Sequence, residues 1–281
     1  MSDTHTTAPT RFVEIDGLKY AYRRWGKEGT TPVLFIPHYR AGMDHWDPII
    51  TDSFARDREV ILFDGRGIAG SEGEPRETIE EMADDIAAFI RTIGVDKVDA
   101  LGFSIGGMQV QELALRHSEL VRKLLLLGTG PRGLILGSDP KVPKVAANPV
   151  PEAADFLYLF FGRSEEAKKA GLDFWERRHQ RTVDVDPPSS MEVAQKQWPA
   201  VIAYRDSADK DKPFDYLGAI KQSTLIVNGI DDIMIDTASS LDMAKHIPDS
   251  QLILYPDAGH GAHFQYPERF VKHATQFLDE Q

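Results

Sequence analysis

One serine in this chain has the surroundings that a serine nucleophile needs. Ser104 lies in the stretch GFSIGG, between Gly102 and Gly107. The pattern G-x-S-x-G is informative where it follows a strand and opens a helix, because the sharp turn lifts the serine oxygen out of the sheet. Such a turn also aims the amide of Ile105 toward a developing negative charge. The alternative is a junction at which glycines only let a strand and a helix pack closely.

Two later segments contain an acid and a base for this serine. A hydroxyl becomes a useful nucleophile only with a base in hydrogen-bonding reach and an acid that orients the base. We expect the acid to be Asp232 in NGIDD, with Asp231 as the alternative and a turn or cap role as the competing interpretation. We expect the base to be His260, in a loop between two glycines, rather than His263, which leads into a helix.

The elements that must position these residues are alternating strands and helices. Short apolar runs predict buried strands, and a capping box of Thr78 and Glu81 predicts the start of the clearest helix. The expected strands cover residues 12–15, 18–24, 33–37, 59–64, 97–103, 122–128, 223–229 and 250–256, and the expected helices cover 79–93, 105–116, 236–246 and 267–278. This order predicts an α/β fold with a mostly parallel central sheet and helices on both faces.

The alternation stops over residues 131–219. This segment opens with Gly and Pro and continues with aromatic-rich helical stretches. We expect a helical cap, or lid, inserted into a core that residues 11–130 and 220–281 form. The simpler interpretation is a helical subdomain with a purely structural role. Residues 1–10 are polar and predict a flexible N-terminal tail.

Composition limits the partners. The formal net charge is −12, which argues against nucleic acid, and the absence of cysteine excludes disulfides. The longest aliphatic run is too short to span a membrane and no signal peptide is visible, so we expect a soluble cytoplasmic protein without a membrane partner. No metal-binding or nucleotide-binding motif occurs, so we expect a small-molecule substrate and no metal or cofactor. A monomer and a homodimer are equally compatible with the sequence.

Together, the motifs make the chain similar to the α/β-hydrolase fold superfamily, and to its serine hydrolases with a helical cap. The resemblance covers residues 12–278 and rests on VLFIPH, FDGRGIAGS, GFSIGG, NGIDD and GHGAHFQYPERF. It implies a catalytic triad in the order Ser104, Asp232 and His260. It also implies an oxyanion hole, to which Ile105 contributes one amide.

The second oxyanion donor falls where the sequence departs from the family pattern. Many relatives have His-Gly after the third strand, whereas this chain has PHYR at residues 37–40. Matching backward from Trp46 predicts the Tyr39 amide as the donor, and we prefer it. Matching forward from His38 predicts the Arg40 amide.

These features predict a serine hydrolase that cleaves an ester or lactone of a small, largely apolar substrate through an acyl-enzyme. The expected pocket residues are His38, Phe103, Phe156, Phe160, Trp175, Trp198 and His263. A buried loop histidine is the simpler interpretation of His38. The resemblance leaves two alternatives open. The same triad can serve a carbon–carbon bond hydrolase or a cofactor-free perhydrolase, and the chain can be a ligand-binding relative with low turnover.

Overall fold

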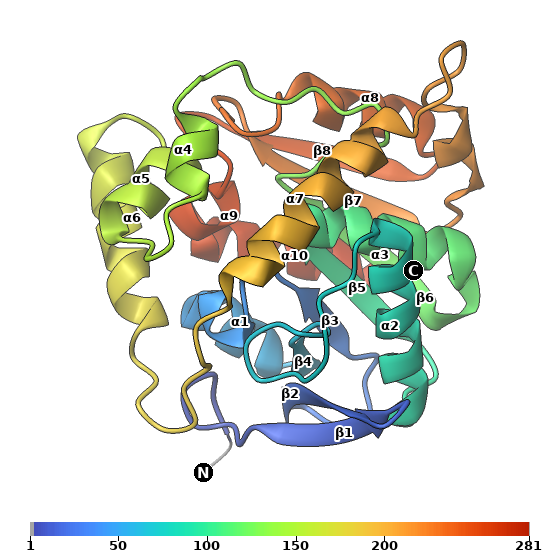
Figure 1. The fold of residues 1–281 in the computed structure, drawn as a ribbon, viewed down its shortest axis with the longest axis vertical. Helices are drawn as coiled ribbons and strands as arrows, with labels where there is room; N and C mark the ends of the chain where they lie inside the picture. The colour runs from blue at the N-terminus through green and yellow to red at the C-terminus, as the bar shows by residue number, and fades with distance from the viewer. Residues whose placement is uncertain (1–2, 281) are drawn as a thin grey trace.

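The computed structural model describes residues 3–280, and these contain an eight-stranded sheet (Figure 1). The strands are β1 Arg11–Ile15, β2 Leu18–Gly26, β3 Val33–Ile36, β4 Glu59–Phe63, β5 Val98–Phe103, β6 Val121–Leu127, β7 Ser223–Gly229 and β8 Ser250–Tyr255. Their order in the sheet is β1-β2-β4-β3-β5-β6-β7-β8. Strand β2 runs antiparallel to β1 and β4, and the remaining pairs are parallel. The predicted mostly parallel α/β fold is confirmed.

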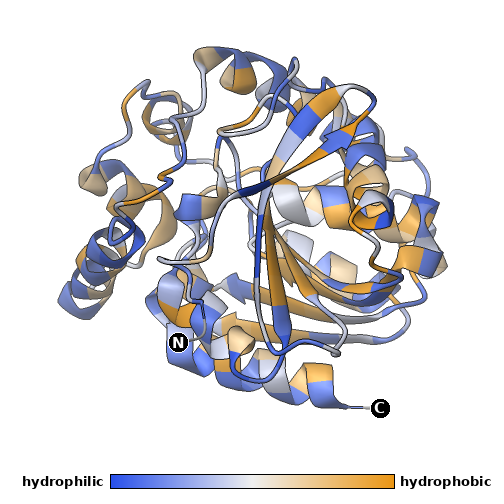
Figure 2. Ribbon diagram, turned by 90° about the horizontal axis from the view of Figure 1, so that it is seen from below, coloured by the Kyte–Doolittle hydropathy of each residue, from blue (hydrophilic) through white to orange (hydrophobic). Residues whose placement is uncertain are grey.

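Helices cover both faces of this sheet. One face carries α1 Pro48–Ala55, α9 Ala262–Gln265 and α10 Pro267–Asp279, and the other carries α2 Ile79–Thr92, α3 Ile105–Arg116 and α8 Ala238–His246. Along β6, for example, Leu125 and Leu127 pack in the first layer and Leu124 and Leu126 in the second. Because both faces are covered, the central strands are apolar along most of their length, as Figure 2 shows.

The local sequence explains where the helices flanking β5 begin. Thr78 caps α2, because its side chain accepts a hydrogen bond from the amide of Glu81, as the sequence predicted. Helix α3 has the predicted bounds and begins directly after Ser104. The serine therefore lies at the carboxyl end of a central parallel strand, the edge where ligands bind in such sheets.

Four helices lie between β6 and β7. They are α4 Val142–Ala146, α5 Ala153–Phe160, α6 Glu165–Arg178 and α7 Met191–Asp206, and we call this segment the helical insertion. Helices α4 to α6 lie together at one side of the molecule, far from the β1–β2 hairpin (Figure 1). Helix α5 packs against α6, and α6 against α9 of the core. Across residues 3–280, no helix combines the length and the apolar character that crossing a membrane requires.

The prediction of a flexible tail over residues 1–10 is wrong for residues 3–10. His5 is fully buried, its amide donates to Asp52 at 2.7 Å and its Nδ1 lies 3.0 Å from Thr51 Oγ1. Arg181 of the insertion side donates to the carbonyls of His5 and Ala8 at 2.9 and 2.8 Å. Polar composition misled the prediction, because long-range hydrogen bonds order this segment. Residues 1 and 2 lie outside the described residues.

Candidate functional site

Ser104 occupies a strained turn between β5 and α3. Its backbone angles are φ 58° and ψ −120°, a left-handed region that a residue with a side chain rarely adopts. The flanking glycines are required by packing. A Cβ atom at Gly102 would lie 2.3 Å from the carbonyl oxygen of Gly106, and one at Gly106 would lie 2.3 Å from that of Ile36. The turn thus places a serine where the strand, the helix and β3 meet.

His260 and Asp232 form a buried pair beside this turn. His260 Nδ1 lies 2.8 Å from Asp232 Oδ2, and both side chains are fully enclosed. The other carboxylate oxygen, Oδ1, accepts the amides of Met234 at 2.8 Å and Ile235 at 3.1 Å. These two amides hold the acid in place, and a carboxylate on Nδ1 directs the lone pair of the imidazole to Nε2.

The second nitrogen of this imidazole is unpaired within the described residues. Nε2 of His260 is buried and has no hydrogen-bond partner among residues 3–280, Ser104 included. The His260 ring stands 5.0 Å from the ring of Phe103, the residue before the serine. Contacts between a nucleophile and its base often tighten only when substrate is bound. An unpaired Nε2 opposite a carboxylate-bound Nδ1 is the form of imidazole that accepts a proton in general base catalysis.

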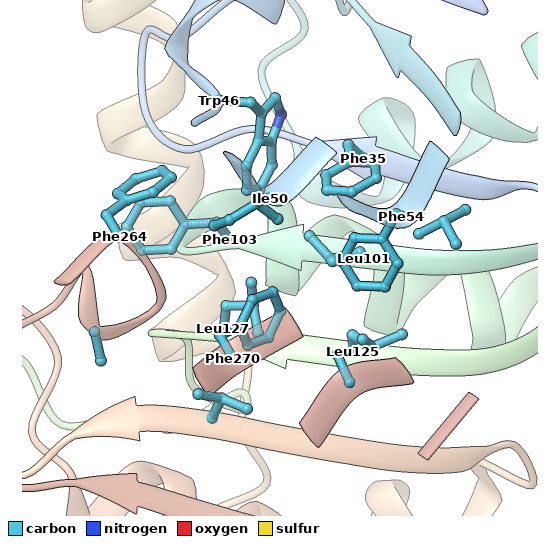
Figure 3. Packing of buried hydrophobic residues seen from close by; sticks show 14 of the residues in the cluster. Phe35, Trp46, Ile50, Phe54, Leu101, Phe103, Leu125, Leu127, Phe264 and Phe270 are labelled. Carbon is cyan, nitrogen blue, oxygen red and sulfur yellow. The ribbon is translucent and has the colours of Figure 1, made fainter. Parts of the chain in front are cut away.

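The alternative acid and base lie in different environments. Asp231 is exposed, and its amide donates to the carbonyl of Ala258 at 2.9 Å. His263 is buried within an aromatic cluster, with its ring 4.4 Å from Phe103 and 4.0 Å from Phe264. Figure 3 shows Phe103 and Phe264 in this cluster. Burial, with a smaller contribution from His260, holds the pKa of His263 well below its usual range, so the ring is neutral. His263 is a packing residue in this environment.

The loop after β3 separates the two oxyanion candidates. The amide of Arg40 donates to Gln197 Oε1 at 2.8 Å, so it is already occupied. For the Tyr39 amide, the described part of the chain contains no hydrogen-bond acceptor. This difference favours Tyr39, together with Ile105 at the first position of α3. The Tyr39 hydroxyl donates to the carbonyl of Ala194 in α7 at 3.2 Å, which ties the loop to the insertion.

His38 lies in the same loop, surrounded by aromatic rings. Its ring centroid is 5.0 Å from that of Phe160 and 5.3 Å from that of Phe103. Its Nδ1 lies 3.1 Å from the carbonyl oxygen of Tyr39. Burial lowers the pKa of His38 to about 3, so this histidine is neutral at physiological pH. It can contribute a neutral imidazole to the wall of a binding site.

A cavity of about 490 Å³ opens above these residues, between the sheet and the helical insertion. The predicted residues that line it are Ser104, His38 and Tyr39 from the core and Phe156, Phe160 and Trp175 from the insertion. Phe103 and His263 are fully buried behind the lining, so their assignment to the pocket is wrong: they pack the core beneath it. Trp198 is 43% exposed and does not line the cavity, so its assignment to the pocket is wrong. Where apolar residues do not recur at helical spacing, the sequence does not show which face of a helix is buried, so the direction of an aromatic side chain cannot be predicted.

Sequence reasoning missed several other residues that line the cavity. His45, Met234 and Arg178 all do so, and Arg178 is the charged residue among the three. A signal for Arg178 existed in its position, because Ala167, Gly171, Phe174 and Arg178 form the buried stripe of α6. Within the described residues, no group of three or more His, Cys, Asp or Glu side chains is placed to hold a metal ion.

Comparison with known proteins identifies the family. A family model described as alpha/beta hydrolase fold matches residues 31–267. The chain is 29% identical to the proline iminopeptidase PfmaB of Pestalotiopsis fici, over 96% of this chain and 99% of that protein. Among solved structures, it resembles an alpha/beta hydrolase fold protein from Chitinophaga pinensis, with 33% identity, a TM-score of 0.90 and coverage of 99% and 100% of the two chains. It also resembles Est816, described as an N-acyl homoserine lactone degrading enzyme, with 26% identity, a TM-score of 0.74 and coverage of 95% and 100%. The chain belongs to the alpha/beta hydrolase fold family.

Proposed function

We propose that this protein is a serine hydrolase that cleaves an ester or lactone of a small, largely apolar substrate. The observation that carries the proposal is the buried contact of 2.8 Å between His260 Nδ1 and Asp232 Oδ2, next to a serine on a strained turn. Hydrolase chemistry is supported by membership of the family and by the names of the relatives, which include an iminopeptidase and a carbamate hydrolase.

The reaction has two stages. Ser104 Oγ attacks the carbonyl carbon while His260 Nε2 takes the hydroxyl proton, and the amides of Ile105 and Tyr39 stabilise the oxyanion. The imidazolium then gives its proton to the leaving alkoxide, and an acyl-enzyme remains. Water enters and attacks the acyl carbon while His260 Nε2 takes one of its protons. The bond between the acyl carbon and Ser104 Oγ then breaks, and the imidazolium returns the proton to Oγ, so that the acid leaves and the serine is restored. Asp232 holds the imidazole in the required tautomer throughout.

An ester or lactone suits the cavity for two reasons. Rings of Phe156, Phe160 and Trp175 supply an apolar wall, which binds an acyl or aryl group through contact area. One solved structure that resembles this chain, Est816, is described as a lactone-degrading enzyme and matches 95% of the chain at 26% identity. We propose that the helical insertion is a cap that closes over the substrate, because the cavity lies between it and the strand ends.

The test combines covalent labelling with a substitution. A fluorophosphonate should label Ser104, and the labelled peptide should be identified by mass spectrometry. Ser104→Ala should lose labelling and reduce ester hydrolysis by roughly 10⁶-fold, with an unchanged melting temperature. An unlabelled protein that hydrolyses no ester or lactone would contradict the proposal. Labelling together with cleavage of vinylogous diketones alone would instead indicate a carbon–carbon bond hydrolase.

A further inference from the structure

Arg178 is a buried cation in the cavity without a hydrogen-bond partner. Arg178 is the last residue of α6 and is 9% exposed. Nε and Nη1 are both buried and bond to no group among residues 3–280. A buried arginine ordinarily has its donors satisfied, because unmade hydrogen bonds of a charged group are costly. This arginine lines the same cavity as Ser104.

Aromatic contacts hold the guanidinium but leave its donors free. The Arg178 carbon Cζ stands 4.7 Å from the ring centre of Phe156 and 5.2 Å from that of Trp175. Stacking uses the face of the guanidinium, whereas its N–H groups lie in its plane. The position at the carboxyl end of α6 also favours a cation, since backbone carbonyls end there. The charge is therefore supported, and Nη2, which is not enclosed and makes no hydrogen bond within residues 3–280, stays available to a ligand.

The nearby carboxylates are already engaged by other groups. Asp44 and Asp186 both pair with Arg23, and each also accepts the backbone amide of the other, at 2.7 and 2.8 Å. Arg181 lies at the edge of the same cluster, 4.0 Å from Asp44. The buried carboxylate of Asp64 interacts with Asp186 and Arg23, and Asp184 interacts with Arg181. Among residues 3–280, Arg23 and Arg181 each have a carboxylate within 4.0 Å, whereas Arg178 has none.

The positive charge extends to the proposed oxyanion loop. After burial, the charge of Arg178 is the largest cause that lowers the pKa of both His38 and His45. Burial lowers the pKa of Arg178 itself to about 10, so the group stays protonated at neutral pH. Asp155, another carboxylate of the lining, accepts from Asn148 and from the amide of Glu152 at 2.7 and 2.9 Å.

We propose that Arg178 is a subsite for a carboxylate of the substrate, so that the cleaved ester or lactone carries an acidic group in addition to its reacting carbonyl. The inference rests on the proposed function and names the substrate class of the same cavity. Nη2 shares one edge of the guanidinium with Nε and another with Nη1. The two N–H groups of either edge match the two oxygens of a carboxylate, and binding would neutralise the unpaired charge. Arg178 is a specificity residue and takes no part in bond breaking.

The first experiment measures binding without turnover. Calorimetry compares monomethyl adipate, which has one carboxylate, with dimethyl adipate, which has none, on the Ser104→Ala protein at neutral pH. The monoanion should bind about 10-fold or more tightly, as for a charge-assisted hydrogen bond. Equal affinities, or binding of neither ester, would overturn the inference. This experiment measures binding alone, so a preference for the monoanion would support the inference even if Ser104 is not the nucleophile. Failure of the proposed function and failure of this inference therefore give different results.

The second experiment assigns the preference to Arg178. Arg178→Met in the same background should abolish it and leave the affinity for dimethyl adipate within about threefold. The matched control is Arg163→Met, because Arg163 is an exposed arginine stacked 5.1 Å from the ring of Tyr158, and it should keep the preference. Unchanged preference in Arg178→Met would overturn the inference. If that variant does not fold, Arg178→Lys provides the test, because lysine keeps the charge without the planar edge. Arg178→Lys should reduce the preference several-fold, and an unchanged preference would overturn the inference.

Discussion

The two walls of the cavity are built in different ways. On the core wall, Ser104 is held by a strained backbone, and behind this wall Asp232 is held by two backbone amides. Each lies within a few residues of a strand end. On the insertion wall, Phe156 and Trp175 come from two helices and are held by packing and by Arg178. Backbone geometry gives the precision that bond breaking needs, whereas packed side chains vary readily in shape. We infer that the core wall carries the chemistry and the insertion wall the selectivity.

The largest expected effect is at the proposed base. His260→Ala should lower kcat for an ester by roughly 10⁶-fold, because it removes the group proposed to accept the serine proton. His263→Leu should lower it by less than about 10-fold, since His263 is packed among rings rather than paired with a carboxylate. Steady-state kinetics on both variants checks this pair. Equal losses in the two would remove the distinction between the proposed base and its neighbour.

The next effect is at the acid. Asp232→Asn should lower kcat by about 10⁴-fold, because an amide at this position favours the wrong tautomer of His260. Asp231→Asn is the matched control, since Asp231 is adjacent but exposed, and should stay within about threefold. Full activity of Asp232→Asn, measured with the same ester, would show that Asp232 is not the acid. It would also contradict our inference that the core side of the cavity carries the chemistry.

A smaller effect is expected on the insertion wall. Trp175→Ala should raise KM for an aryl ester by about 10-fold, through loss of apolar contact area, and should change kcat little. Trp198→Ala should leave both constants unchanged, because Trp198 is 43% exposed and outside the cavity. A large loss of kcat in Trp175→Ala would show that the insertion also positions the reacting groups, which would weaken the division between the walls.

The smallest effect concerns stability, at a histidine packed behind the core wall. The pKa of His263 is lowered in the folded state, so below pH 6.5 the unfolded chain binds a proton that the folded chain does not. This histidine therefore makes the folded state less stable as the pH falls. His263→Leu should flatten the dependence of unfolding free energy on pH between 6 and 5 by up to about 1.4 kcal/mol per pH unit. Urea unfolding at several pH values measures it, and parallel curves for the two proteins would contradict it.

The sheet and the candidate site on it were largely predictable, for local reasons. Buried strands are short apolar runs ended by turn residues, and the observed β7 matches its predicted bounds. Ser104 follows such a run directly, and Asp232 and His260 lie in the loops after later runs, so their placement at one edge follows from parallel strands. The distinction between Tyr39 and Arg40 was not predictable, because it depends on which amide Gln197 occupies, and Gln197 lies 157 residues further along the chain.

By itself, the sequence determined the fold, the strand positions to within about two residues and the three residues proposed for catalysis, because periodicity and turn chemistry act over short distances. Only the tertiary structure decided the ordered N-terminal segment, the exposure of Trp198 and the unpaired charge of Arg178. These depend on packing between segments that are distant in the chain. The face that a residue of the insertion presents to the cavity is set by how its helix lies against the core, and no short stretch of sequence contains that information.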